Sequence, residues 1–85
     1  MAATRVWLVD RTYNDKGMVR LVYATTDGER YLIKQLSERM LMNKDVTAAR
    51  DVDEERLEPT GDEERERYAA EATRMADQHD PDDAV

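Results

Sequence analysis

Two turn signals between three apolar runs constrain the fold of this chain more than any other feature. The apolar runs are Val6-Trp7-Leu8-Val9, Leu21-Val22-Tyr23-Ala24 and Tyr31-Leu32-Ile33, which are rich in β-branched and aromatic residues. Asn14-Asp15-Lys16-Gly17 separates the first two runs, and Asp27-Gly28 separates the last two. Strand-forming runs joined by such short turns predict an antiparallel, three-stranded β-meander.

The turns also predict local geometry. Asp27-Gly28 is the preferred pair for a two-residue type I′ turn, in which both residues adopt a positive φ. The Asn14–Gly17 tetrapeptide suits a type I turn that ends with Gly17 in the left-handed conformation. We therefore expect strands over Arg5–Thr12, Met18–Thr25 and a third segment around residues 31–33, in a stretch that ends at Ser37.

The predicted strands are apolar on both faces at mid-length. A meander with one face in water alternates apolar and polar side chains, whereas the first run places four apolar residues in succession. One helix and a short tail can cover only one face of the sheet. We therefore expect a second subunit on the other face. This predicts a homodimer that forms through the sheet, either by its face or by its edge.

The second half of the chain predicts one amphipathic helix, from Gly61 to His79. Thr60 and Glu63 have the spacing of a capping box, and the acids at residues 62–64 suit the positive end of the helix dipole. One helical stripe consists of Tyr68, Ala72, Met75, Ala76 and His79.

Two segments between the meander and the helix are open to more than one interpretation. Residues 38–45 indicate either a helical turn or a connection. Residues 46–52 are compatible with a strand or a helix, and their β-branched residues favour a fourth strand. The fold class is therefore α+β: an antiparallel β-meander of three to four strands with one C-terminal amphipathic helix packed on the sheet. Residues 1–79 are expected to form one domain, and residues 80–85 an acidic, solvated and flexible tail.

Composition excludes several classes of site. The 85-residue chain has no cysteine, which excludes disulfides, thiolate metal sites and a cysteine nucleophile. Its apolar runs are far shorter than the roughly 20 residues needed to span a bilayer. The N-terminal segment lacks the apolar core of a signal peptide, so we expect a cytoplasmic protein that does not contact membranes.

Few residues are suited to catalysis. Ser37 and His79 are the only serine and histidine, and nothing around Ser37 resembles a nucleophile elbow. Residues 51–56 begin like a calcium loop, but Arg56 stands where such a loop requires glycine. We therefore predict no catalytic residue, no cofactor and no metal. The predicted function is that of a small, non-enzymatic interaction or regulatory module. Its expected partner is a second copy of the chain, with an unidentified protein as the alternative.

Charge is divided unevenly along the chain, whose formal net charge is −7. Residues 1–44 hold eight Lys and Arg against five Asp and Glu, whereas residues 45–85 hold five against fifteen. Basic and aromatic residues interleave on the meander, so an alternative function is auxiliary nucleic-acid binding by the arginine-bearing sheet. Flexible methionines suit adaptable contacts. The candidate interaction surface comprises Trp7, Arg11, Arg20, Tyr23, Tyr31, Met40 and Met42.

The chain resembles small, uncharacterised acidic proteins of salt-loving archaea in the following segments: Val6–Val9, Tyr23–Thr25 with Asp27–Arg30, Thr47–Ala49 and Arg67–Ala72. Abundant carboxylates and scarce lysine (three Lys against ten Arg) are also typical of proteins adapted to molar salt. The resemblance spans most of the chain. It implies a halophilic archaeal origin and no assigned function, and it supplies no catalytic residues.

Overall fold

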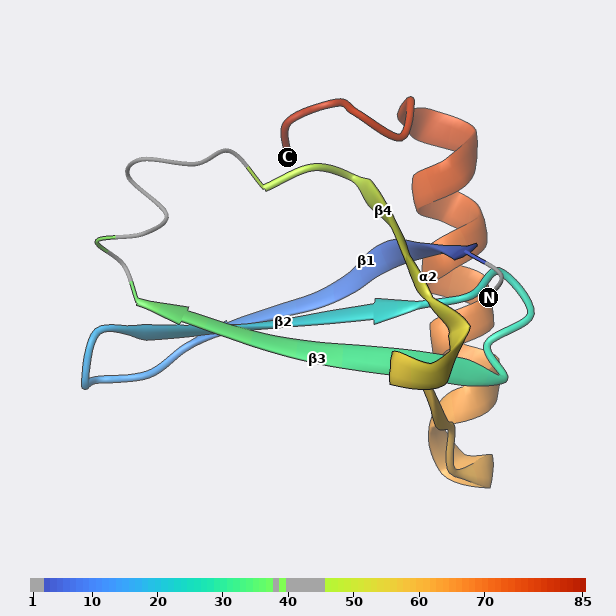
Figure 1. The fold of residues 1–85 in the computed structure, drawn as a ribbon, viewed down its shortest axis with the longest axis horizontal. Helices are drawn as coiled ribbons and strands as arrows, with labels where there is room; N and C mark the ends of the chain where they lie inside the picture. The colour runs from blue at the N-terminus through green and yellow to red at the C-terminus, as the bar shows by residue number, and fades with distance from the viewer. Residues whose placement is uncertain (1–2, 38, 40–45) are drawn as a thin grey trace.

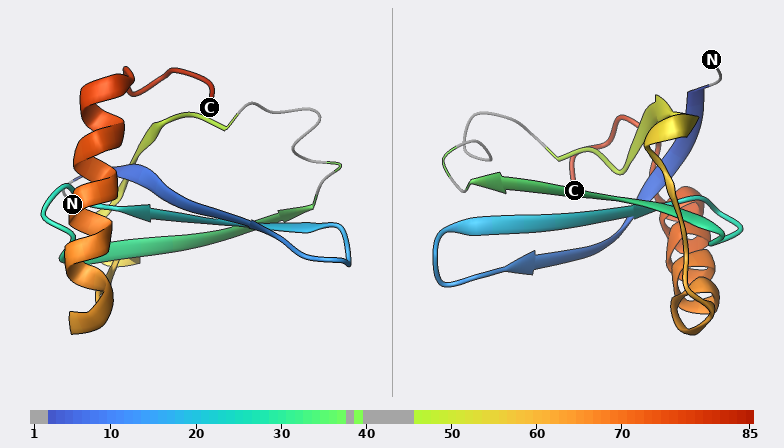
Figure 2. Two further views of the ribbon diagram at one scale, coloured as in Figure 1. Left: turned by 180° about the vertical axis from the view of Figure 1, so that it is seen from behind. Right: turned by 60° about the horizontal axis from the view of Figure 1, so that its bottom comes forward.

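The fold is a five-stranded antiparallel sheet with strand order β4-β1-β2-β3-β5, crossed at one end by the C-terminal helix α2 (Figures 1 and 2). This structure is a computed structural model, and it describes residues 3–37, 39 and 46–85. The predicted α+β class, antiparallel sheet and C-terminal helix are confirmed. The predicted number of three to four strands is wrong, because a two-residue segment before the helix forms a fifth strand.

The elements follow the predicted order along the chain. The meander consists of the first three strands, and the strand interpretation favoured for residues 46–52 is confirmed by β4 and by a bridge between Thr47 and Ala84. The open question about residues 38–45 lies outside the described residues, apart from Arg39. The elements are β1 (Ala3–Tyr13), β2 (Met18–Ala24), β3 (Arg30–Ser37), β4 (Ala49–Asp53), the 3-10 turn η1 (Glu54–Arg56), β5 (Glu58–Pro59) and α2 (Asp62–Gln78).

The turn between β1 and β2 has the predicted backbone. Gly17 has a φ of 77°, which confirms its left-handed conformation. The side-chain oxygen of Asn14 accepts hydrogen bonds from the backbone N–H groups of Lys16 and Met18, both at 3.0 Å. The asparagine side chain therefore closes the turn by satisfying backbone donors that the ladder leaves free.

The turn between β2 and β3 differs from the prediction. Gly28 has a φ of 73°, but no non-glycine residue in the described part of the chain has a positive φ, so the predicted type I′ turn is wrong. The Asp27 carboxylate instead accepts hydrogen bonds from the Thr25 hydroxyl and the Glu29 N–H. These bonds hold a longer turn, and they lower the pKa of Asp27 from its ordinary value.

One face of the sheet, called the helix face below, packs against α2 (Figure 2). The sheet contributes Trp7, Val22 and Ala24, and the helix contributes Tyr68 and Ala72. All five residues are at most 9% exposed. The two helix residues are four positions apart and thus lie on one side of α2, which confirms the predicted apolar stripe.

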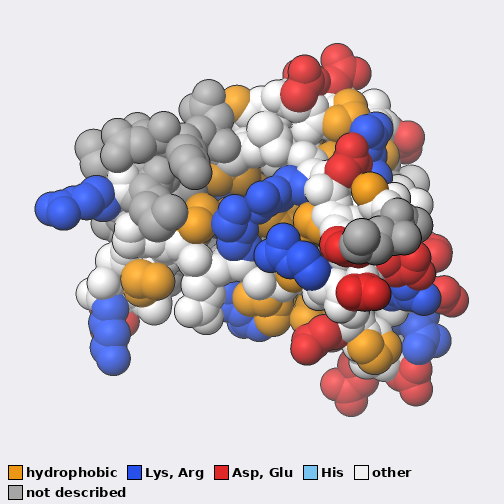
Figure 3. Space-filling view, in the orientation of Figure 1, with side chains coloured by type: hydrophobic (Ala, Val, Ile, Leu, Met, Phe, Trp, Pro, Cys, Tyr) orange, Lys and Arg blue, Asp and Glu red, His pale blue; other side chains and the backbone are white. Residues whose placement is uncertain are grey.

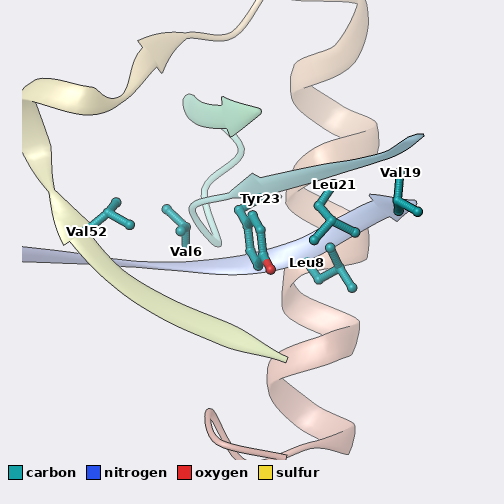
Figure 4. Close-up of a cluster of buried hydrophobic side chains, with 6 residues drawn as sticks. All are labelled: Val6, Leu8, Val19, Leu21, Tyr23 and Val52. Carbon is teal, nitrogen blue, oxygen red and sulfur yellow. The ribbon is translucent and has the colours of Figure 1, made fainter. Parts of the chain in front are cut away.

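The other face of the sheet, called the opposite face below, carries a second buried cluster (Figure 4). Its members are at most 5% exposed and are Val6, Leu8, Val19, Leu21, Tyr23 and Val52. Val46, Leu57 and Val85, from segments outside the meander, pack against this cluster. The chain therefore covers both faces of its own sheet. The expectation that the second face requires another subunit is wrong.

The segment predicted as a solvated tail lies along the start of β4. The N–H groups of Ala48 and Ala49 donate to the carbonyls of Asp83 and Pro81, at 2.8 and 3.0 Å. The Val85 N–H donates to a backbone carbonyl just before β4. The Val85 side chain packs against the buried clusters on both faces of the sheet. Residues 80–85 thus contribute directly to the packing of the domain.

The start of α2 lacks a side-chain cap. Its N-cap residue is Gly61, and the hydroxyl of Thr60 is buried without a hydrogen-bond partner among the described residues. The predicted capping box of Thr60 and Glu63 is therefore wrong. The three acids predicted for the first turn are at residues 62–64, as expected, and they complement the helix dipole.

Replacing Gly61 with serine is expected to stabilise the protein. The Gly61 backbone is extended (φ −67°, ψ 155°), and a Cβ atom there would find no heavy atom within 4 Å. A serine hydroxyl can cap the free N–H groups, and the unfolded chain loses entropy, so we expect a gain of about 0.5–1 kcal/mol. Urea unfolding measures this gain. Gly61→Ala is the control, and equal stability of the two variants would contradict the capping explanation.

Candidate self-association edge

The structure separates the residues of the predicted interaction surface. Trp7 is 8% exposed on the helix face, and Tyr23 is 2% exposed on the opposite face. Tyr31 is partly buried beside Tyr68, with 6.1 Å between the ring centroids. These three aromatic side chains are therefore part of the packing within the domain. Met40 and Met42 lie outside the described residues.

The two arginines of the predicted surface lie on different faces of the sheet. Arg11 pairs with Leu21, so its side chain lies on the opposite face, whereas Arg20 pairs with Thr12 on the helix face. Arg11 also donates to the Val85 carbonyl at 2.8 Å, which ties it to the end of the chain. Arg11 and Arg20 thus do not form one arginine-bearing surface.

Lys and Arg side chains gather over the middle of the opposite face (Figure 3). Arg11 and Lys34 flank Leu21 across three strands, and Arg50 lies 5.9 Å from the centroid of the Tyr23 ring. Burial raises the pKa of the Tyr23 hydroxyl, and the Arg50 and Arg11 guanidinium groups oppose that rise. We call Arg11, Lys34 and Arg50 the basic row. Because Tyr23 is buried, this row lies beside no exposed aromatic ring on β2.

Backbone groups on the outer side of β3 alternate in direction. The Thr25 N–H donates to the Arg30 carbonyl at 3.1 Å, so these two residues form a hydrogen-bonded pair between β2 and β3. Bonded and non-bonded pairs alternate in an antiparallel ladder. The N–H and C=O groups of Ile33 and Gln35 therefore point away from β2, toward the edge of the sheet.

β5 occupies only the beginning of this edge. It pairs with Arg30 and Tyr31, and the Thr60 N–H donates to the Glu29 carbonyl on the same side. The neighbouring Glu58 carboxylate of β5 raises the pKa of the Tyr31 hydroxyl. From Leu32 onward, none of the described strands pairs with the outer side of β3.

The remaining edges of the sheet carry features that hinder pairing with another strand. The outer side of β1 beyond Leu8 has no partner among the described strands, but the register shifts before Asp10, and Asp10 and Arg11 are charged.

The edges at β4 and β5 are protected in other ways. At β4 the Ala49 N–H already donates to Pro81, and two acids, Asp51 and Asp53, follow along the strand. β5 is only two residues long and ends with Pro59, which has no N–H. Short strands, prolines and charged side chains commonly protect sheet edges. The described sheet therefore has its least protected edge along the second half of β3.

The side chains along this part of β3 suit contact with another strand. Ile33 is 37% exposed, one of two large apolar side chains exposed in the described residues, and Gln35 is exposed beside it. The segment from Tyr31 to Ser37 contains no acid, and its one charged residue is Lys34 on the opposite face. We call residues 32–37 of β3 the β3 edge.

Sequence reasoning did not include Ile33 or Gln35 in the candidate surface. Ile33 was assigned to a strand only as part of an apolar run. Its outward backbone groups follow from the phase of the β2–β3 ladder, which the sequence does not contain. The sequence shows only that residues 30–37 lack acids, and residues 16–26 share this property.

The described residues give little support for a metal site, a ligand pocket or a membrane-spanning helix. Among them, no group of three or more His, Asp or Glu side chains is arranged to hold a metal ion. A hollow beside β4 is lined by Arg5 and Asp51, but both partners of this ion pair are about half exposed (51% and 55%). The described part of the chain has no helix with the length and apolar character needed to span a bilayer.

Comparison with known proteins gives a family and no function. The model of a family of unknown function (DUF7967) matches residues 1–85. The chain therefore belongs to this family. No curated protein and no solved structure matched the chain.

Proposed function

We propose that this member of a family of unknown function is a small, non-enzymatic interaction module that self-associates through the β3 edge. The observation that carries the proposal is the outward direction of the Ile33 and Gln35 backbone groups, beside an exposed isoleucine. Exposed strand edges template pairing with another strand. The edge, rather than a face, is favoured because the chain already buries both faces of its sheet.

A second copy of the chain is the partner that the charges of the edge favour. Each copy has a net charge of −7, so two copies repel each other over most approaches. The β3 edge is free of acids, and it allows contact where this repulsion is smallest. If a two-fold axis normal to the sheet relates the two copies, their β3 strands pair antiparallel and the sheet continues from one copy into the other. This arrangement gives a closed dimer.

We also propose that the protein works in the cytoplasm at molar salt. The resemblance to acidic proteins of salt-loving archaea and the excess of 20 acids over 13 bases support this setting. The Debye length falls from about 10 Å at 0.1 M to about 3 Å at 1 M salt. Repulsion between copies is then screened, and dimerisation should strengthen as salt rises.

Replacing Gln35 with proline is expected to abolish dimerisation without unfolding the protein. The Gln35 N–H points outward, so proline removes no hydrogen bond of the β2–β3 ladder but leaves the edge without its central donor. Sedimentation velocity over a range of protein and salt concentrations measures the change. Wild type and the matched control Gln35→Thr, which keeps the N–H, should form dimers at high concentration.

Two outcomes would contradict this proposal. One is a monomeric wild type at every protein and salt concentration. The other is a Gln35→Pro variant that dimerises as well as wild type while its circular dichroism spectrum shows the same fold.

Auxiliary nucleic-acid binding remains a second candidate, favoured by the basic row on the opposite face (Figure 3). Phosphate contacts by Arg11, Lys34 and Arg50 would weaken steeply with salt. The burial of Tyr23 leaves this row without the stacking platform that single-strand binders use. Adding a labelled oligonucleotide to the same sedimentation samples at low salt tests this candidate, since binding would make the label sediment with the protein.

A further inference from the structure

We infer that a groove at the start of β4 is a docking site for an extended, acidic segment of a partner protein, and that residues 80–85 occupy it in the free chain. We call residues 80–85 the strap, and residues 46–49, with which it pairs, the strap groove. The strap runs from the end of α2 back to the start of β4 (Figures 1 and 2). The inference concerns a different part of the chain from the β3 edge, and it does not rest on self-association.

The strap pairs with the strap groove as an added antiparallel strand does. Thr47 and Ala84 form an antiparallel bridge. Two backbone hydrogen bonds flank this bridge, both at 2.8 Å: from the N–H of Val85 to the carbonyl of Val46, and from the N–H of Ala48 to the carbonyl of Asp83. This is the pattern of a non-hydrogen-bonded pair. Main-chain bonds of this kind give β-strand addition its affinity, and any extended segment can form them.

Val85 is the apolar anchor of the strap. Its side chain packs against the buried clusters on both faces of the sheet, whose members include Leu8 and Trp7. The Arg11 guanidinium group donates to the Val85 carbonyl at 2.8 Å, which fixes the backbone beside the anchor. Pockets for side chains give β-strand addition its specificity. The strap groove therefore selects a segment with an aliphatic residue at this position.

The strap groove depends on its cover, whereas the strap has few buried contacts. Ala48 and Ala49 are at most 5% exposed, and both of their N–H groups donate to the strap. Opening the strap removes these hydrogen-bond partners and exposes the apolar pocket that Val85 fills. Among the strap residues, all of which the structure describes, only Val85 joins a buried cluster, and Asp80 and Asp82 are exposed. Segments with so few buried contacts open at low cost in free energy.

The connection between α2 and the strap favours an occupant from another molecule. α2 ends at Gln78, and the strap turns back through a turn that two local bonds between Asp80 and Asp83 hold. This turn sets three aspartates, at residues 80, 82 and 83, beside the negative end of the helix dipole, where the last turn of α2 has no base. A segment from a partner makes the same contacts in the strap groove without this turn.

The charges around the strap groove suit an acidic segment. A hollow of about 430 Å³ lies where β4 meets the strap. The sheet lines it with the two guanidinium groups of Arg5 and Arg50 against one carboxylate, that of Asp51, and the strap contributes Asp82. The sheet side of the hollow thus carries a net positive charge. Charge complementarity of this kind favours an acidic partner over a basic one.

A disulfide trap on the full chain tests this inference, because the natural chain has no cysteine. In a non-hydrogen-bonded pair the Cα atoms are about 4.5 Å apart, within the range of about 4.4–6.8 Å that a disulfide spans. The probe is a synthetic peptide with the sequence of residues 79–85 and the change Ala84→Cys. In a glutathione redox buffer, this peptide is expected to link to the Thr47→Cys chain. Non-reducing mass spectrometry measures the linked fraction.

Val85 provides matched controls on both sides of the trap. In the peptide, the added change Val85→Asp removes the anchor, so linkage should fall by roughly threefold to tenfold, since Val85 is partly buried. In the chain, Val85→Asp weakens the strap, so linkage of the first peptide should rise by a similar factor. Circular dichroism checks that the Thr47→Cys/Val85→Asp chain is folded.

Four outcomes would overturn the inference. Equal linkage of the two peptides would show collision without docking, and no linkage of either would show that the strap is not displaced. A Thr47→Cys/Ala84→Cys chain that does not close its own disulfide would contradict the pairing in the strap groove. Stronger linkage between whole Thr47→Cys and Ala84→Cys chains than with the peptide would identify a second copy, and not a partner protein, as the occupant. Sedimentation of the Gln35→Pro variant tests the β3 edge separately.

Discussion

Replacing Gly28 with alanine is expected to destabilise the protein by about 2–5 kcal/mol, through strained backbone and overpacking combined. Gly28 has a φ of 73°, and it is buried where the β2–β3 turn meets α2. A Cβ atom at this position would lie 2.2 Å from the Arg65 carbonyl oxygen and 2.8 Å from the Ala69 nitrogen. Both neighbours are helix backbone, so α2 would have to move away from the sheet.

Gly17→Ala separates the two causes of this loss. Gly17 also has a positive φ, of 77°, but it lies in the β1–β2 turn at the opposite end of the strands from α2 (Figure 1). Its substitution should cost only the backbone strain, about 1–2 kcal/mol. Urea unfolding of both variants, followed by circular dichroism, measures the difference. Equal losses would contradict the close contact between the second turn and α2.

Replacing Leu21 with alanine is expected to cost about 2–5 kcal/mol, the range for truncating a buried leucine. Leu21 is 1% exposed on the opposite face, in the cluster with Leu8 and Tyr23. Segments of the same chain cover this cluster, so the loss should be the same at every protein concentration. For a domain whose total stability is on the order of 5–15 kcal/mol, such a loss is large.

The concentration dependence of that loss distinguishes two accounts of the opposite face. If a second copy covered the face, Leu21→Ala would cost little in dilute solution and more as the protein dimerised. Urea unfolding at concentrations well below and well above the dimerisation midpoint measures this dependence. A loss seen only in the dimer would contradict burial of this face within one chain.

Local sequence signals predicted the elements that depend on nearby residues. The three strands of the meander follow from short apolar runs and turn residues, and α2 follows from its stripe and its acidic first turn. β5 escaped prediction because two residues that include Pro59 carry no strand pattern. The sequence also did not predict which residues cover the opposite face. The covering residues are Val46, Leu57 and Val85, single apolar residues in polar segments without periodicity.

The face of the sheet on which Arg11 lies depends on an irregularity in β1 that the sequence does not reveal. The β1–β2 register shifts between Leu8 and Asp10. One extra residue in a strand moves every later side chain to the other face. Without this bulge, Arg11 would share the helix face with Arg20, as the predicted arginine-bearing surface requires. With it, Arg11 joins the basic row.

The candidate site could not be read from side-chain types at all. It rests on the direction of backbone groups at Ile33 and Gln35, which the phase of the β2–β3 ladder and the shortness of β5 determine together. Sequence reasoning raised a sheet edge as one route to a dimer. It had no means to choose among the edges, because their protection depends on which strands lie outermost.

Amide hydrogen exchange of Ile33 and Gln35 as a function of protein concentration tests the central claim most directly. In the dimer these two N–H groups bond to the second copy, so their exchange should slow as concentration rises. Leu21, whose N–H lies inside the sheet, should exchange slowly at every concentration. Fast exchange of Ile33 and Gln35 even in the most concentrated samples, whatever the state of association, would contradict self-association through the β3 edge.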